Sequence, residues 1–253
     1  MAHERAGQLA QPQDLIDVAE LVTAYYTRHP EPGNPDHAVT FGTSGHRGSS
    51  LDNAFNEDHI HATTQAIVDY RAGQGIEGPL YIGRDTHGLS EPAMVSALEV
   101  LTANGITVMV DDKGRYTPTP AVSHAILTHN RDLDGGPNGS DKRRADGIVV
   151  TPSHNPPRDG GFKYNPPTGG PADADATDWI AARANDYLAK GLDGVKRRSV
   201  EKSGDLLVKH DYLNNYVADL PNVVNIAAIR DAGVKIGADP MGGASVDYWG
   251  AIA

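Results

Sequence analysis

The sequence contains no cysteine among its 253 residues. This absence excludes a disulfide framework, a thiolate nucleophile and a zinc site built on cysteine. Long apolar runs are missing too, and no stretch approaches the roughly 18 apolar residues that a membrane span requires. Positive charge is scarce, because 22 Lys and Arg face 33 Asp and Glu, for a formal net charge of -11. Such a chain is a poor candidate for sequence-independent nucleic-acid binding, which depends on neutralising phosphates.

What the sequence does contain is ample apolar material together with many turn-forming residues. Hydrophobic residues make up 39% of the chain, which also has 28 Gly and 17 Pro. The first residues are polar and lack the apolar region of a signal peptide. We therefore expect a globular cytoplasmic protein with no membrane segment.

Short apolar runs alternate with helical patterns in the middle of the chain. Residues 80–83, 106–110 and 147–150 read as buried strands, and helical spacing fills the two intervals between them. This order predicts an α/β fold with a mixed, mostly parallel sheet sandwiched by helices. Further helices are predicted at 15–25, 60–71 and 175–190, and a further strand at 39–41.

The composition changes near residues 203–211, which suggests a linker or domain edge. We expect a first domain over 1–208. Residues 209–253 contain two predicted helices and a predicted strand at 234–238, too little for an ordinary independent core. They read as the incomplete start of a second domain. The strand would have an unpaired edge, which predicts that the residues after about 211 are either poorly ordered or held by self-association with a second copy.

The most informative segment is Gly147–Pro167, which carries Ser153 just past the end of an apolar strand. Ligands of open α/β sheets bind at that edge, and the prolines that flank the serine restrict the backbone. His154, Asn155 and Lys163 add a proton carrier, an amide and a cation close by. From these residues alone, a Pro-rich surface turn with an ordinary serine stays open as the alternative.

Two other predicted strands end in segments of chemical interest. Residues 41–48, Phe-Gly-Thr-Ser-Gly-His-Arg-Gly, can form an anion-binding concavity from backbone N–H groups around Ser44. Arg47 in that segment can hold a phosphate or carboxylate by two hydrogen bonds. Arg84 and Asp85 follow the strand at 80–83, where they either orient site groups or form a surface ion pair. P-loop, dinucleotide-binding and His-Glu-x-x-His motifs are absent from the sequence.

Together these segments resemble the α-D-phosphohexomutases. Residues 151–157, Thr-Pro-Ser-His-Asn-Pro-Pro, resemble the phosphoserine loop of that superfamily, and residues 41–48 resemble its N-terminal motif. Longer matches at 160–173 and 237–249 resemble the bacterial, glucose-specific phosphoglucomutase branch. The resemblance runs from about residue 12 to the end of the sequence.

The resemblance implies the interconversion of glucose 1-phosphate and glucose 6-phosphate. Ser153 would carry a phosphoryl group, donate it to form glucose 1,6-bisphosphate, and recover the other phosphate after the sugar reorients. Lys163 would serve as general acid/base or neutralise phosphate charge. His154 would orient groups or shuttle a proton.

The same resemblance implies ligand contacts. Arg47, Ser44, Asn155 and Arg84 would bind substrate or phosphate. Mg²⁺ would bind through the phosphate on Ser153, with its remaining ligands outside this chain. Glucose 1,6-bisphosphate would act as activator and intermediate, and the partner of the protein would be a phosphosugar.

Three alternatives remain at this point. The chain can belong to another phosphohexomutase, acting on mannose or glucosamine phosphates, because the sugar-reading loop of the family is missing from the sequence. It can be a non-catalytic phosphosugar-binding module, since the expected metal, sugar and distal phosphate loops are missing as well. A serine hydrolase at Ser153 would predict ester cleavage that does not need Mg²⁺.

Overall fold

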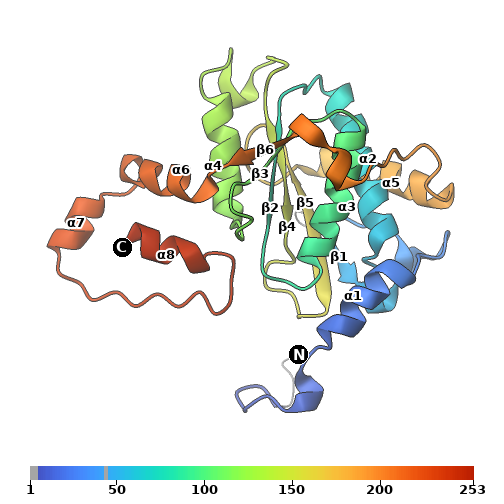
Figure 1. Ribbon diagram of the computed structural model, residues 1–253, viewed down its shortest axis with the longest axis horizontal. Helices are drawn as coiled ribbons and strands as arrows, with labels where there is room; N and C mark the ends of the chain where they lie inside the picture. Colours follow the sequence, from blue (N-terminus) through green and yellow to red (C-terminus); the bar gives the residue numbers. More distant parts are fainter. Residues whose placement is uncertain (1–4, 43–44) are drawn as a thin grey trace.

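The protein, described by a computed structural model over residues 5–42 and 45–253, contains a six-stranded sheet packed between helices (Figure 1). The strands are β1 (His46–Ser49), β2 (Leu80–Arg84), β3 (Val108–Asp111), β4 (Asp146–Val150), β5 (Asp159–Asn165) and β6 (Leu207–His210). The α-helices are α1 (Val18–Thr27), α2 (Glu57–Gly73), α3 (Ser90–Ala103), α4 (Thr119–Asn130), α5 (Ala174–Ala189), α6 (Tyr212–Asp219), α7 (Ile226–Asp231) and α8 (Val246–Ile252).

The sheet is mixed and mostly parallel, in the order β1-β5-β4-β2-β3-β6. Strands β4, β2, β3 and β6 run parallel to one another, whereas β5 pairs antiparallel with both β4 and β1. The carboxyl ends of the parallel strands therefore meet at one edge of the sheet. This arrangement confirms the predicted α/β class.

Helices cover both faces of the sheet. Figure 1 shows α1, α2, α3 and α5 on one side and α4 on the other, with α6, α7 and α8 extending beyond α4. Strand β2 alternates between the two layers, as a strand of period two must. Leu80 and Ile82 belong to the larger core, and Tyr81 belongs to the core beside α4.

Three strands, β1, β5 and β6, form where the sequence pattern did not predict them, and the two strands predicted at 39–41 and 234–238 do not form. Of residues 39–41, Phe41 makes a single bridge with His46, while the strand itself, β1, begins at His46. β1 and β5 contain glycine and polar residues, which have low strand propensity. They form because they pair with each other over four residues and because β5 also pairs with β4.

The first part of the 209–253 segment continues the core of the preceding residues. β6 crosses the predicted boundary at 208/209 and pairs with β3 over four residues. The hydroxyl of Tyr212 donates to the carbonyl oxygens of Met109 (2.9 Å) and Ile82 (3.2 Å). The division into a domain at 1–208 and the start of another at 209–253 stays a prediction.

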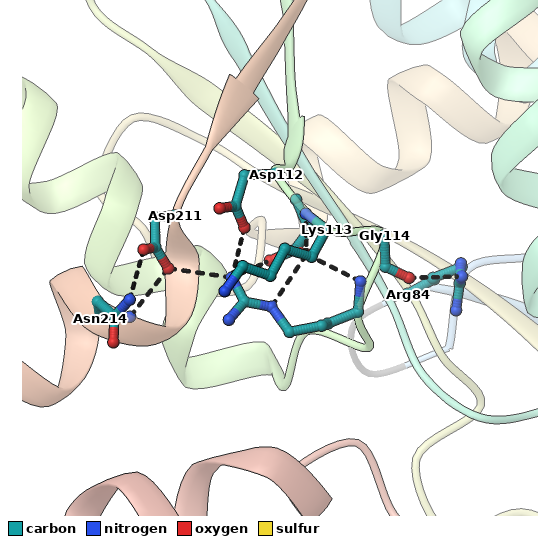
Figure 2. Close-up of polar contacts among 8 residues, drawn as sticks. Arg84, Asp112, Lys113, Gly114, Asp211 and Asn214 are labelled. Carbon is teal, nitrogen blue, oxygen red and sulfur yellow. Dashed lines mark hydrogen bonds and ion pairs between the residues drawn. The ribbon is translucent and has the colours of Figure 1, made fainter.

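Arg115 also anchors this segment to the sheet. Its guanidinium contacts Asp111, Asp112 and Asp211, and Asp211 is the N-cap of α6. Figure 2 shows the carboxylates of Asp112 and Asp211 turned toward this shared cation, with Asn214 bound to Asp211 on the far side. The loop after β3 thus holds the first turn of α6.

The prediction of a strand at 234–238 is wrong. These residues run as exposed coil, with Val234 66% and Ile236 68% exposed. Within the described part of the chain no strand pairs with them, and a strand without a partner gains no ladder hydrogen bonds. The unpaired edge that led to the self-association prediction is therefore not formed there, and self-association stays a prediction without that support. None of the helices in the described part of the chain is long and apolar enough to cross a membrane.

Candidate functional site

A cavity of about 560 Å³ opens at the carboxyl edge of β2 and β4. Residues 85–87 follow β2 and residues 151–157 follow β4, and both segments contribute to its wall. Residues 117–120, at the start of α4, add a second side, and residues 241–245 add a third. Four segments far apart in the sequence therefore meet at the sheet edge where ligands of such folds bind.

Ser153 lies on the rim of this cavity in an unusual backbone conformation. Its φ is +64°, in the left-handed region that non-glycine residues seldom adopt. Its backbone N–H donates to Oγ1 of Thr151 (3.0 Å), which closes a tight local turn. The side chain of Ser153 is exposed to solvent, as an acceptor or donor of a transferred group must be.

Lys163 is the direct partner of the serine hydroxyl. Its Nζ donates to Ser153 Oγ at 2.6 Å. Lys163 lies on β5, opposite Val149 in the antiparallel ladder, so the pairing of β4 with β5 returns it to the base of the serine loop. The structure thus brings together two residues that the sequence pattern placed ten positions apart.

The surroundings of Lys163 lower the pKa of its amine. Burial lowers the pKa of Lys163, the Arg47 guanidinium lowers it further, and Asp85 acts in the opposite direction. Lys163 is only 8% exposed. A lysine whose charged form is disfavoured can exchange a proton with the hydroxyl that it touches.

The Arg47 segment packs tightly against β5. Arg47 Nε donates to the carbonyl oxygen of Pro152, directly before Ser153, at 3.3 Å. Gly45 is needed for this approach, because a Cβ there would lie 2.6 Å from both Cγ of Lys163 and the carbonyl oxygen of Phe162. Ser44, the other predicted phosphate contact of this segment, lies outside the described residues.

The remaining predicted site residues are placed differently from one another. Asn155 lines the cavity, and its Nδ2 donates to Asp159 Oδ2 at 3.2 Å. His154 is exposed and is not among the described residues that line the cavity. Arg84 is likewise not among the residues that line it, and it pairs with Glu91 and donates to the carbonyl oxygen of Gly114 (3.1 Å). The roles given to all three stay predictions.

The structure adds two site residues that sequence reasoning missed. His87 Nε2 lies 2.6 Å from the carbonyl oxygen of Pro157, in the serine loop. Thr86 Oγ1 donates to the carbonyl oxygen of Gly242 at 2.6 Å, which links the β2 end to the 241–245 wall. Their one signal in the sequence was their place directly after a buried strand.

The described residues do not fit a Mg²⁺ site. They contain no cluster of three or more His, Asp or Glu side chains suited to a metal ion. Asp85, the carboxylate at the cavity, uses Oδ1 to accept from the Ser90 hydroxyl (2.5 Å) and from the His87 amide (3.0 Å). Mg²⁺ prefers six oxygen ligands in octahedral geometry. The described residues therefore do not by themselves assign a chemical role to a metal ion.

Comparison with known proteins gives a consistent result. Residues 38–190 match the family described as "Phosphoglucomutase/phosphomannomutase, alpha/beta/alpha domain I". A phosphoglucomutase of Komagataeibacter xylinus is 56% identical over 246 residues, which cover 96% of this chain and 43% of that protein. Phosphoglucomutase 1 of Saccharomyces cerevisiae is 31% identical over 235 residues, which cover 83% of this chain and 39% of that protein.

A solved structure supports the same fold. The open form of parafusin, a phosphoglucomutase from Paramecium, matches with a TM-score of 0.65 and 21% sequence identity. The match covers 88% of this chain and 41% of that one. The chain thus spans about two fifths of the length of the relatives that it matches.

Proposed function

The chain belongs to the phosphoglucomutase/phosphomannomutase family, and from that premise we propose that it supplies the phosphoserine half of a phosphoglucomutase. The observation that carries the proposal is the 2.6 Å contact between Lys163 Nζ and Ser153 Oγ at the rim of the cavity. An exposed hydroxyl beside an amine of lowered pKa is the pairing that an activated nucleophile requires.

Ser153 would accept a phosphoryl group from glucose 1,6-bisphosphate and return one to glucose 1-phosphate or glucose 6-phosphate. In the accepting step, a bond forms between Ser153 Oγ and phosphorus while the bond between phosphorus and the sugar oxygen breaks. The serine loses its proton and the sugar oxygen gains one. In the donating step the same changes run in reverse.

Lys163 would manage the proton at Ser153 Oγ. Its neutral amine accepts the hydroxyl proton as Oγ attacks, and its ammonium form protonates Oγ as the phosphoryl group leaves. Arg47 stands beside this pair and would offset the negative charge of the transferred group, which is the main requirement of phosphoryl transfer. Asn155, on the cavity wall, would contribute an amide contact to the phosphosugar.

The proposal is tested by the phosphorylation of Ser153. The purified chain is incubated with glucose 1,6-bisphosphate and Mg²⁺, and peptide mass spectrometry measures the phosphate on Ser153 over time. We expect a single phosphate on that residue. Ser153→Ala should accept none, and Lys163→Met should slow the transfer by roughly 100-fold or more, the size of a general acid/base contribution. A chain that stays unmodified, or one that is modified elsewhere, would overturn the proposal.

The sugar, the metal ion and the compartment belong to the same proposal. Identity to relatives named phosphoglucomutase favours glucose phosphates over mannose or glucosamine phosphates. Competing the bisphosphate against mannose and glucosamine bisphosphates in the same assay tests this preference. Mg²⁺ as cofactor rests on the family resemblance, and the cytoplasm as compartment rests on the composition of the sequence.

A further inference from the structure

The loop that carries Ser153 is held at both ends by side chains from other segments. Arg47, on β1, donates to the carbonyl oxygen of Pro152, the residue before the serine, at 3.3 Å. His87, after β2, contacts the carbonyl oxygen of Pro157, four residues after the serine, at 2.6 Å. The two contacts come from strands on opposite sides of β4 and β5 in the sheet.

The hydrogen bonds of the His87 ring fix its tautomer. The backbone N–H of Leu89 donates to Nδ1 at 3.1 Å, so that Nδ1 is an acceptor. A carbonyl oxygen only accepts, so Nε2 must carry the proton that binds Pro157. Both ring nitrogens are used in the neutral form.

The backbone of His87, from which the ring extends, is also fixed. The His87 amide donates to Asp85 Oδ1 at 3.0 Å, and the same oxygen accepts from the Ser90 hydroxyl. Leu89, whose amide orients the ring, is fully buried in the core. The imidazole is therefore a rigid extension of the sheet edge rather than a mobile surface side chain.

The serine loop needs such an external contact. Ser153 is held at φ +64°. A non-glycine residue keeps this strained conformation only where contacts with the surrounding structure hold it there. Within the loop, the Asn155 amide donates to the carbonyl oxygen of Pro152 at a long 3.4 Å. At this end of the loop the Pro156 carbonyl accepts from the Asp159 amide at 2.9 Å, a bond between near neighbours in the chain. Pro157 has no N–H to donate, so its carbonyl oxygen is the polar backbone group through which it can be tied to another segment.

We propose that His87 is a positioning residue for Ser153, acting through the Pro157 carbonyl to hold the serine hydroxyl against Lys163. Arg47 holds the other end, and His87 completes the clamp. The catalytic consequence rests on the function proposed above, whereas the effect on loop geometry does not. Phosphoryl transfer is sensitive to this geometry, because small misplacement of reacting groups costs large factors in rate.

Two variants of similar size separate the bonds of the ring. In His87→Gln the side-chain amide nitrogen occupies the place of Nε2 and can still donate to Pro157. In His87→Asn the side-chain oxygen occupies the place of Nδ1 and can still accept from Leu89, but the side chain no longer reaches Pro157. His87→Ala removes both bonds. The unfolding midpoint of each variant shows whether it is folded.

The rate constant of Ser153 phosphorylation and the half-saturating bisphosphate concentration are then measured for each folded variant. We expect His87→Gln to stay near the wild-type rate constant. His87→Asn should lose about 10- to 100-fold in rate constant with little change in half-saturating concentration, since positioning is lost and ligand contacts are kept. Equal rate constants for the Gln and Asn variants would overturn the proposal.

Amide hydrogen exchange tests the same proposal without any turnover. Exchange at Ser153 and Asn155 should be faster in His87→Asn than in His87→Gln, while exchange in β4 stays unchanged. Identical exchange in both variants would refute the clamp. If wild-type Ser153 accepts no phosphate but the exchange rates differ as expected, the proposed function fails and the positioning role of His87 stands.

Discussion

Ser153 holds backbone strain at the residue where chemistry is proposed. A left-handed φ costs a non-glycine L-residue about 1–2 kcal/mol. Replacing Ser153 by glycine or by alanine removes the same hydroxyl and the same contact with Lys163. We expect Ser153→Gly to exceed Ser153→Ala in unfolding free energy by about 0.5–1 kcal/mol, because relief of strain outweighs the greater chain entropy of unfolded glycine. Urea denaturation of the two variants measures the difference. A glycine variant less stable than the alanine variant would show that the loop does not strain residue 153.

Single residues were predictable from the sequence where they belong to a distinctive motif. Ser153 stood out by its place after a strand and Lys163 as a cation in the same segment, and the structure brings them into contact. His87 and Thr86 did not stand out, because they act on the carbonyl oxygens of Pro157 and Gly242. Such contacts leave no pattern in the sequence, since any residue supplies a carbonyl.

Elements were predictable where apolar periodicity was strong. The buried strands β2 and β4 and the helices α2 to α5 follow from it. β1 and β5 were not predictable in this way, because their glycines have low strand propensity and are required by close packing instead. Gly161 on β5 illustrates this selection, since a Cβ there would lie 2.1 Å from the carbonyl oxygen of Thr151.

The loop after β3 gives a prediction about how α6 is held. Asp111 is 5% exposed, and its carboxylate meets the Arg115 guanidinium, as do those of Asp112 and Asp211 (Figure 2). Arg115→Met leaves these carboxylates without their cation. We expect a loss of about 2 kcal/mol in unfolding free energy, the scale of hydrogen bonds to charged groups, and faster amide exchange in α6.

Lys113→Met is the matched control for this change. It removes one positive charge from the same loop, at an exposed side chain. Exposed substitutions of this kind shift stability by less than about 0.5 kcal/mol. If both variants lose the same stability, the net charge of the loop matters and the Arg115 contacts do not.

At the scale of the whole molecule, the sheet includes residues from both of the predicted domains, 1–208 and 209–253. The sequence predicted a linker near 203–211, yet β6 adds to the sheet there and α6 packs against α4. As a result, residues 241–245 reach the cavity of Ser153 and bind Thr86. Long-range pairing of this kind cannot be derived from local periodicity, because a four-residue strand at the edge of the sheet depends on its partner strand for stability.

Buried histidines make the stability of the whole molecule depend on pH. Burial lowers the pKa of His46 to about 4, of His59 to about 3 and of His61 to about 4, from an ordinary 6.5. Below pH 6.5 the unfolded chain binds protons that the folded protein does not. The stability that these residues contribute is therefore complete above pH 6.5 and is lost as pH falls toward 4. Each such histidine contributes up to about 1.4 kcal/mol per pH unit to the slope of unfolding free energy.

His61 allows this dependence to be tested with little disturbance of packing. Its Nδ1 contacts Arg197 at 3.3 Å, and glutamine replaces the ring by an uncharged polar side chain of similar size. Between pH 6 and pH 5, where most carboxylates remain ionised, His61→Gln should reduce the slope of unfolding free energy against pH by about 1 kcal/mol per unit. Urea denaturation at closely spaced pH values measures the slopes of the wild-type protein and the variant. An unchanged slope in His61→Gln would mean that His61 takes up its proton as readily in the folded protein as in the unfolded chain.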